Sequence, residues 1–147
     1  MAKQVKKNEY PITPKEYQSI LQGLEFVNAS LVSLKYESKP GNLEKPVKIG
    51  LSTKTEIKNK ANDKVVLSIN FKLTGKSENR TVMAISGEYF LDYISKKEFT
   101  AEFLEVYNDI SLKVLIWPYL RELFANITQR SNIAPFVLPL LKFMPKS

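Results

Sequence analysis

The residues best suited to chemistry in this chain are three acidic ones on a predicted helix. Glu102, Glu105 and Asp109 recur at helical spacing, so their carboxylates share a face and could bind a hard cation. They also lie in the first turns of that helix, where carboxylates stabilise the helix dipole, and we favour this structural role. The chain contains no Cys and no His, which excludes thiolate and imidazole catalysis and ordinary zinc sites.

Other catalytic motifs find no support either. The sequence has neither a P-loop nor a dinucleotide-binding fingerprint. Ser86 precedes Gly87, but the second flanking glycine of a nucleophile elbow is missing. We therefore predict a protein that is not an enzyme and needs no cofactor.

The basic residues suggest a second class of function. The net charge is +7, and lysines follow the predicted strands, where they could neutralise phosphates. Base stacking would need aromatic residues among them, but Phe71 has the opposite parity to its neighbour Lys72. We favour a solvated sheet face and keep a nucleic-acid-binding module as the alternative. The lysines concerned are Lys48, Lys54, Lys58, Lys60, Lys64 and Lys72.

The elements that must position these residues form an α+β fold in one domain, residues 1–147. Thr13 and Pro14 predict the start of a short helix that ends at Gly23. Alternating apolar residues predict a four-stranded antiparallel meander, and a long helix from about Ala101, capped by Thr100, should kink or restart at Pro118. The strands are expected over residues 24–38, 47–58, 65–74 and 81–93.

The ends of the chain carry further expectations. Residues 1–10 are expected to be mobile, and they have no apolar region of the kind that a secretory signal needs. No stretch is long and apolar enough to cross a bilayer, so we expect a cytoplasmic protein without membrane insertion.

The first strand has an irregular pattern. Leu24 and Phe26 alternate with polar residues, whereas Asn28 and Ser30 interrupt this face. Val27, Ala29 and Leu31 fill the opposite one. Either a bulge redirects the strand, or both of its faces are covered, as they would be at a subunit interface.

The C-terminal part of the chain is unusually apolar for its length. Trp117, Pro118 and Tyr119 interrupt the helix, and Arg121, Glu122 and Arg130 follow among aliphatic residues. Residues 133–143 hold two prolines among mostly aliphatic and aromatic side chains, which excludes a regular helix or a central strand. Such an extended apolar segment must lie against a groove or line one.

This order of features resembles the C-terminal half of the SecB chaperone family. The resemblance rests on a few positions over about 30 residues, with a weaker match of the strand pattern over residues 24–93. The matching residues are Trp117, Pro118, Tyr119, Arg121, Glu122, Leu123, Ile127, Arg130, Pro135, Leu138, Pro139 and Phe143.

The resemblance implies an ATP-independent holdase that binds non-native client polypeptide in hydrophobic grooves. It also implies a homotetramer, built as a dimer of dimers. By matching segments, we expect the client groove to include Phe26, Leu34, Tyr36, Phe71, Phe90, Trp117, Tyr119, Phe136 and Leu138. We expect the oligomer interface to include Val27, Leu31, Leu120, Leu123, Phe124 and Ile127.

The chain also departs from the family members that serve protein export. Those are acidic and engage the SecA motor, whereas this chain is basic and has Ser33 where they carry Asp, although Glu37 matches a second carboxylate. It also stops at Ser147, where they continue into another helix and a tail. Handover of preproteins to SecA is therefore the weaker alternative. We expect a dedicated chaperone of a toxin-antitoxin system, with an antitoxin as one candidate client.

Overall fold

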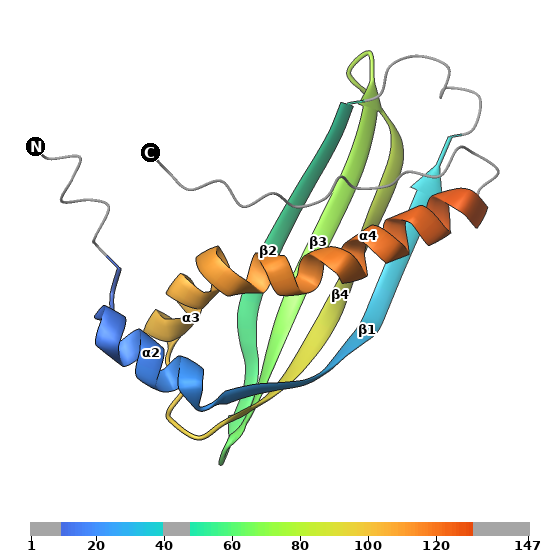
Figure 1. The fold of residues 1–147 in the computed structure, drawn as a ribbon. Helices are drawn as coiled ribbons and strands as arrows, with labels where there is room; N and C mark the ends of the chain where they lie inside the picture. The colour runs from blue at the N-terminus through green and yellow to red at the C-terminus, as the bar shows by residue number, and fades with distance from the viewer. Residues whose placement is uncertain (1–9, 40–47, 131–147) are drawn as a thin grey trace, which may run out of the picture.

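The computed structural model describes residues 10–39 and 48–130 and shows the expected α+β architecture (Figure 1). A short helix precedes four long strands, and a helical region follows them. Two expectations lie outside the described ranges. They are the mobile start, of which the structure describes only Tyr10, and the extended apolar segment over residues 133–143. The elements are α2 (Pro14–Gln22), β1 (Leu24–Ser38), β2 (Lys48–Ala61), β3 (Lys64–Ser77), β4 (Arg80–Ser95), α3 (Ala101–Tyr107), the π-helical turn η1 (Asn108–Leu112) and α4 (Lys113–Arg130).

The four strands are antiparallel to their neighbours in the order β1-β4-β3-β2. Only β2, β3 and β4 form the predicted meander, and its extension to β1 was wrong, because β1 pairs with β4 rather than with β2. The two meander turns are tight, with positive φ at Asn62, Glu78 and Asn79, so neighbouring strands must pair. The link between β1 and β2 is longer, since β1 ends at Ser38 and β2 begins at Lys48, and this length allows the crossing.

The first strand contains the bulges that its pattern suggested. The register with β4 shifts between Phe26 and Asn28 and again between Leu31 and Ser33. Each shift adds one β1 residue, Val27 and then Val32, that has no partner on β4. Phe26, Leu31 and Leu34 therefore lie on one face of the strand despite their uneven spacing, but only Phe26 packs against the core, whereas Leu31 and Leu34 are exposed.

The core lies between one face of the sheet and the helices α3 and α4 (Figure 1). Most alternate residues of β3 and β4 are buried there, because alternate side chains of a strand point to the same face. Aromatic rings fill the end near α3, where Phe103 stacks on Tyr17 and Tyr107 with ring centroids 5.0 and 5.4 Å apart. Further along, Phe124 of α4 meets Phe71 of β3 edge to face at 5.7 Å.

Both predicted helix starts are confirmed by their caps. The Thr13 hydroxyl accepts a hydrogen bond from the backbone N–H of Glu16 at 3.1 Å. The Thr100 hydroxyl accepts one from the N–H of Phe103 at 3.0 Å. These bonds satisfy backbone donors that the first turn of a helix leaves free.

The long helix is interrupted earlier than Pro118. It changes direction between α3 and α4, at the π-helical turn η1, whereas Pro118 lies inside a continuous α4 (Figure 1). The side chain of Asn108 accepts a hydrogen bond from the Thr55 hydroxyl of β2 at 2.9 Å, which fixes the turn on the sheet. Pro118 is tolerated because it is exposed, as is Val114, whose carbonyl loses its helical donor and can bond to water instead.

Candidate functional site

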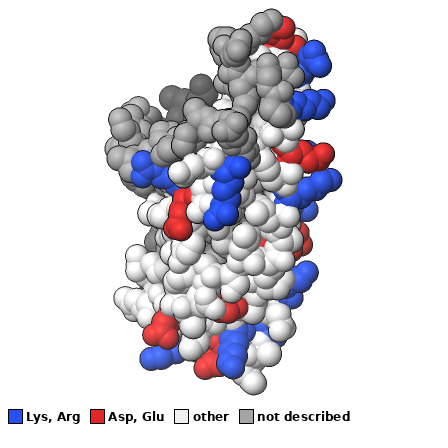
Figure 2. All heavy atoms as spheres, turned by 90° about the vertical axis from the view of Figure 1, so that its right-hand side faces the viewer, with Lys and Arg blue, Asp and Glu red and all other residues white. Residues whose placement is uncertain are grey.

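The most conspicuous surface feature is the outer edge of the sheet at β1. Four aliphatic side chains of this strand face solvent, a group that we name the β1 edge surface. They are Val27, Leu31, Val32 and Leu34, exposed by 55, 40, 46 and 43 %. Because β1 is the last strand of the sheet, its outward N–H and C=O groups have no strand to pair with among the described residues. Figure 2 views the molecule from this side and shows a largely uncharged surface bordered by charged side chains.

Behind the β1 edge surface, aromatic rings connect β1 to the helix. Leu31 lies opposite Tyr89 in the register with β4, and the Tyr89 ring meets the half-buried Tyr119 ring of α4 at 6.0 Å. Burial raises the pKa of Tyr89, and the nearby Glu122 and Tyr119 raise it further. Tyr89 is buried, so these aromatic contacts connect β1 to α4 within the core and do not extend the exposed surface.

A depression interrupts this surface at Gly87. Leu34 lies opposite Gly87, and these two residues line a cavity of about 380 Å³ together with Phe71 and the polar Ser33 and Asn70. A Cβ atom at Gly87 would come within 2.4 Å of the Ser33 carbonyl oxygen and 2.8 Å of the Phe71 ring. Only glycine therefore lets the bulged β1 and the Phe71 ring approach each other here.

The predicted groove residues occupy three different environments. Phe26, Tyr36, Trp117 and Tyr119 are half-buried and pack against the core, and Leu34 is exposed. Phe71 is buried between the sheet and α4. Phe90 lies on the opposite face of the sheet, beneath the Lys58 ammonium group at 5.8 Å, so Phe71 and Phe90 cannot line one groove on the same face. Phe136 and Leu138 lie outside the described residues.

The predicted interface residues divide in the same way. Val27 and Leu31 are exposed on β1. Leu120 and Phe124 are fully buried within the subunit, and Leu123 and Ile127 are half-buried against its core. The burial of Leu120 and Phe124 is already explained by the subunit's own sheet.

Sequence reasoning missed several exposed apolar residues. Val32 belongs to the second bulge, and Ile110 and Val114 lie on the solvent side of η1 and α4. Reading each break in the β1 alternation as a bulge would have placed Val27 and Val32 outward. No feature of the sequence predicted the π-helical turn in which Ile110 is exposed.

The outer face of the sheet carries charges of both signs, visible along the right-hand border of Figure 2. Lys54 lies 3.9 Å from Glu56, and Lys58 is over Phe90. Lys60 is not available to a ligand, because its ammonium group donates to the Phe99 carbonyl at 2.8 Å. Mixed charge and local partners favour the solvated-face interpretation over a phosphate-binding track.

The acidic residues do not assemble into a metal-binding group within the described ranges. No group of three or more acidic residues there could hold a metal ion, which includes Glu102, Glu105 and Asp109. Ser68 donates a hydrogen bond to Glu88 and accepts one from Asn70, and the Ser68 side chain is buried in the sheet. None of the helices in the described part of the chain is long and apolar enough to span a membrane.

Comparison with known proteins identifies the fold. No family model matches the chain, and no curated protein matches it at a significant level. A solved structure of the SecB-like chaperone Rv1957 of Mycobacterium tuberculosis, in complex with a ChAD peptide from the HigA1 antitoxin Rv1956, matches with a TM-score of 0.71 and 18 % identity. The match covers 88 % of this chain and 99 % of that one, so the fold is SecB-like. A Streptococcus agalactiae protein of unknown function matches with a TM-score of 0.45 and 11 % identity, over 80 % of this chain and 97 % of that one.

Proposed function

We propose that this protein is a chaperone that binds non-native segments of a client polypeptide on its β1 edge surface. The observation that carries the proposal is the row of four exposed aliphatic side chains on β1, whose outer edge pairs with no other strand among residues 10–39 and 48–130. Monomeric proteins rarely expose contiguous apolar surface, and where they do, it commonly marks a binding site. An edge strand adds backbone hydrogen bonds that any client sequence can make, so affinity does not require sequence specificity.

The class of client is proposed from the fold neighbour. Rv1957 is a SecB-like chaperone that was solved with a peptide from an antitoxin. We therefore propose that this chain also serves an aggregation-prone antitoxin. The sequence shows no nucleotide-binding motif, in keeping with a holdase that works without ATP.

We further propose that the protein assembles from several copies, with a tetramer expected from the SecB-like fold. Val27 and Leu31 are the predicted interface residues that are exposed, and Val114 adds an apolar position on the outer side of α4. Burying such side chains between copies would stabilise the assembly by about 25 cal/mol for each Å² of apolar surface that is removed from water. Leu34 and the half-buried Tyr36 and Tyr119 then remain as the client-binding end of the surface.

Suppression of aggregation tests the proposal. A chemically denatured model protein is diluted into buffer without nucleotide, and light scattering is followed with and without this protein. We expect wild-type protein to suppress scattering and Leu34→Asp to suppress it much less, because a carboxylate in the apolar surface must be desolvated when a client binds. Absence of suppression by the wild type in molar excess would refute the holdase.

Ile49 supplies the matched control for this assay. It is an aliphatic residue, 38 % exposed, on the other edge strand, β2. Ile49→Asp should leave suppression unchanged if the client binds at β1, and equal losses in both variants would contradict the assignment of the surface. Sedimentation measurements on Val27→Asp test self-association separately, since that variant should shift the protein to smaller species.

A further inference from the structure

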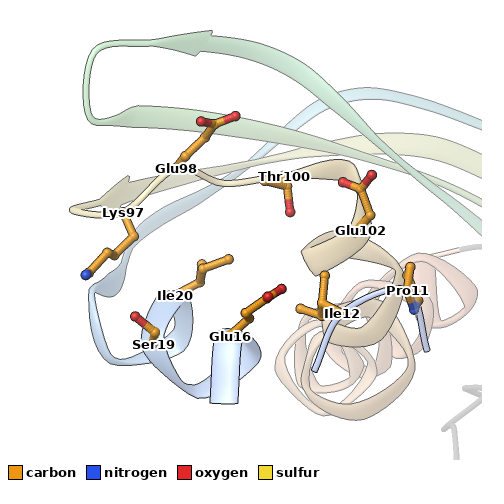
Figure 3. A pocket seen from close by; sticks show the side chains of 9 residues that line it. All are labelled: Pro11, Ile12, Glu16, Ser19, Ile20, Lys97, Glu98, Thr100 and Glu102. Atoms are coloured by element: carbon orange, nitrogen blue, oxygen red, sulfur yellow. The ribbon is translucent and has the colours of Figure 1, made fainter. Parts of the chain in front are cut away.

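The hollow between α2 and the connector from β4 to α3 is a visible feature of the surface, but nothing in it requires a ligand. Its volume is about 480 Å³, and Glu16, Glu98 and Glu102 stand around it (Figure 3). All three residues are exposed, so water already solvates their carboxylates. The edge of β1 differs, because its backbone groups point in a fixed direction and determine how a partner strand must lie.

The backbone groups that face outward on β1 follow from one hydrogen bond at its end. The N–H of Lys39 donates to the Val82 carbonyl at 2.8 Å, and the register places Ser38 opposite Met83. Hydrogen-bonded and non-hydrogen-bonded pairs alternate along an antiparallel ladder, so Ser38 and every second residue before it turn their N–H and C=O groups away from β4. The register is regular back to Ser33. The outward-facing residues of this stretch are therefore Leu34, Tyr36 and Ser38.

The side chains of this stretch present a different chemistry on each face of the sheet. Leu34 and Tyr36 lie on the face that the helices cover, where Leu34 is nevertheless exposed by 43 %. Lys35 and Glu37 lie on the opposite face, with their charged groups 3.5 Å apart and their side chains 76 and 72 % exposed. A strand that pairs with this edge would place its alternate side chains beside the same two kinds of neighbour.

The geometry of such pairing brings the charged positions closest together. An antiparallel partner would exchange hydrogen bonds with Leu34, Tyr36 and Ser38. Its residues opposite Lys35 and Glu37 would then form non-hydrogen-bonded pairs, in which the Cα atoms are about 4.5 Å apart rather than about 5.5 Å. Opposite charges at these positions stabilise the pairing, and like charges destabilise it.

We propose that the edge of β1 prefers extended client segments with the order basic, aliphatic, acidic, aliphatic, bound antiparallel to residues 34–37. The basic residue lies opposite Glu37, and the acidic residue lies opposite Lys35. The aliphatic residues lie beside Tyr36 and Leu34, and they remove the exposed part of Leu34 from water. This inference rests on the proposed function and names the class of segment that the chaperone binds most tightly.

The other edge strand carries a matched pair of charges without the apolar neighbours. Lys54 and Glu56 of β2 are 3.9 Å apart, and their side chains are 78 and 57 % exposed. The alternating residues beside them are Thr53 and Thr55, and the Thr55 hydroxyl already donates to Asn108. Strand β2 therefore offers the charges alone, which makes it the control strand.

Two fluorescently labelled peptides of equal composition test the preferred order. They are Thr-Lys-Val-Glu-Val and Thr-Glu-Val-Lys-Val, and fluorescence anisotropy during titration with the protein gives their dissociation constants. We expect wild-type protein to bind the first peptide at least about threefold more tightly, because two favourable charge pairs replace two repulsive ones. The exchange Lys35→Glu/Glu37→Lys should reverse this preference, whereas Lys54→Glu/Glu56→Lys should leave it unchanged. All four side chains are largely exposed, so neither exchange disturbs the core.

Methylation of single peptide nitrogens tests the strand pairing itself. In the first peptide, the N–H of the valine opposite Tyr36 points toward β1, and its methylation should weaken binding by about fivefold or more. The N–H of the glutamate opposite Lys35 points away from β1, so its methylation should change the dissociation constant by less than about twofold.

Three results would overturn the proposal. They are the lack of a preference for the first peptide, a preference that persists in Lys35→Glu/Glu37→Lys, and equal losses from the two methylations. If wild-type protein still suppresses aggregation alongside any of these results, the chaperone function stands and only the preferred segment is wrong. If wild-type protein does not suppress aggregation, the proposed function itself fails.

Discussion

Gly87 offers the sharpest test of how the β1 edge surface is built. In Gly87→Ala, the new methyl group would lie 2.4 Å from the Ser33 carbonyl oxygen and 2.8 Å from the Phe71 ring. The carbonyl belongs to the bulged backbone of β1, and Phe71 is held by Phe124 and Tyr89. Neither neighbour is a flexible side-chain end that could turn away. Overpacking of this kind typically costs about 1–3 kcal/mol, and with two rigid neighbours we expect the upper end of that range.

Urea unfolding followed by circular dichroism measures this cost against a glycine in an open position. At Gly50, a Cβ atom would meet only the Thr74 hydroxyl, at an ordinary 3.5 Å, so Gly50→Ala should change the free energy of unfolding by less than about 0.5 kcal/mol. Phe71→Leu in the Gly87→Ala background removes the ring clash but not the clash with the Ser33 carbonyl, so we expect partial rescue at most. A loss below about 1 kcal/mol in Gly87→Ala would show that β1 yields easily, and the account of a rigid bulge would be refuted.

Three further predictions concern the core. Phe124→Ala should lower the free energy of unfolding by about 3–5 kcal/mol in urea unfolding, because the Phe124 side chain is fully buried. This variant therefore tests the stability of the subunit and not its self-association. Tyr93→Phe should cost about 1–2 kcal/mol in urea unfolding, since the buried hydroxyl of Tyr107, 3.0 Å from that of Tyr93, would lose its partner. Burial, followed by the hydrogen bond to Tyr107, raises the pKa of Tyr93. Burial also raises the pKa of Tyr107, although its hydrogen bond to Tyr93 lowers it. The folded state keeps these protons where the unfolded chain loses them, so urea midpoints should fall as the pH rises above about 10, and less steeply in Tyr93→Phe/Tyr107→Phe.

Local signals in the sequence were strong enough to predict most elements. Thr13 and Thr100 cap the helices as expected, and strict alternation placed β2, β3 and β4. These features depend on neighbours in the chain, so the sequence carries them directly.

Long-range features were harder to predict. The pairing of β1 with β4 depends on contacts between strands that are distant in sequence. The link between β1 and β2 is long, so the sequence does not determine which strand lies next to β1 in the sheet. The α-helical pattern of Leu120 and Phe124 showed that these residues are buried, but it could not tell whether a sheet of the same chain or another copy buries them. The π-helical turn contains Asn108, which accepts a hydrogen bond from Thr55 of β2, a residue far away in sequence.

The two edges of the sheet differ in a way that limits how a partner can bind. Strand β2 exposes lysines such as Lys48 and Lys54, which discourage pairing with another strand, whereas β1 exposes aliphatic side chains. The bulges at Val27 and Val32 break the regular hydrogen-bonding edge of β1 at two points, so the longest regular stretch begins only at Ser33. Under the proposed function, a client strand would pair over this short stretch alone, and apolar side chains would supply much of its affinity.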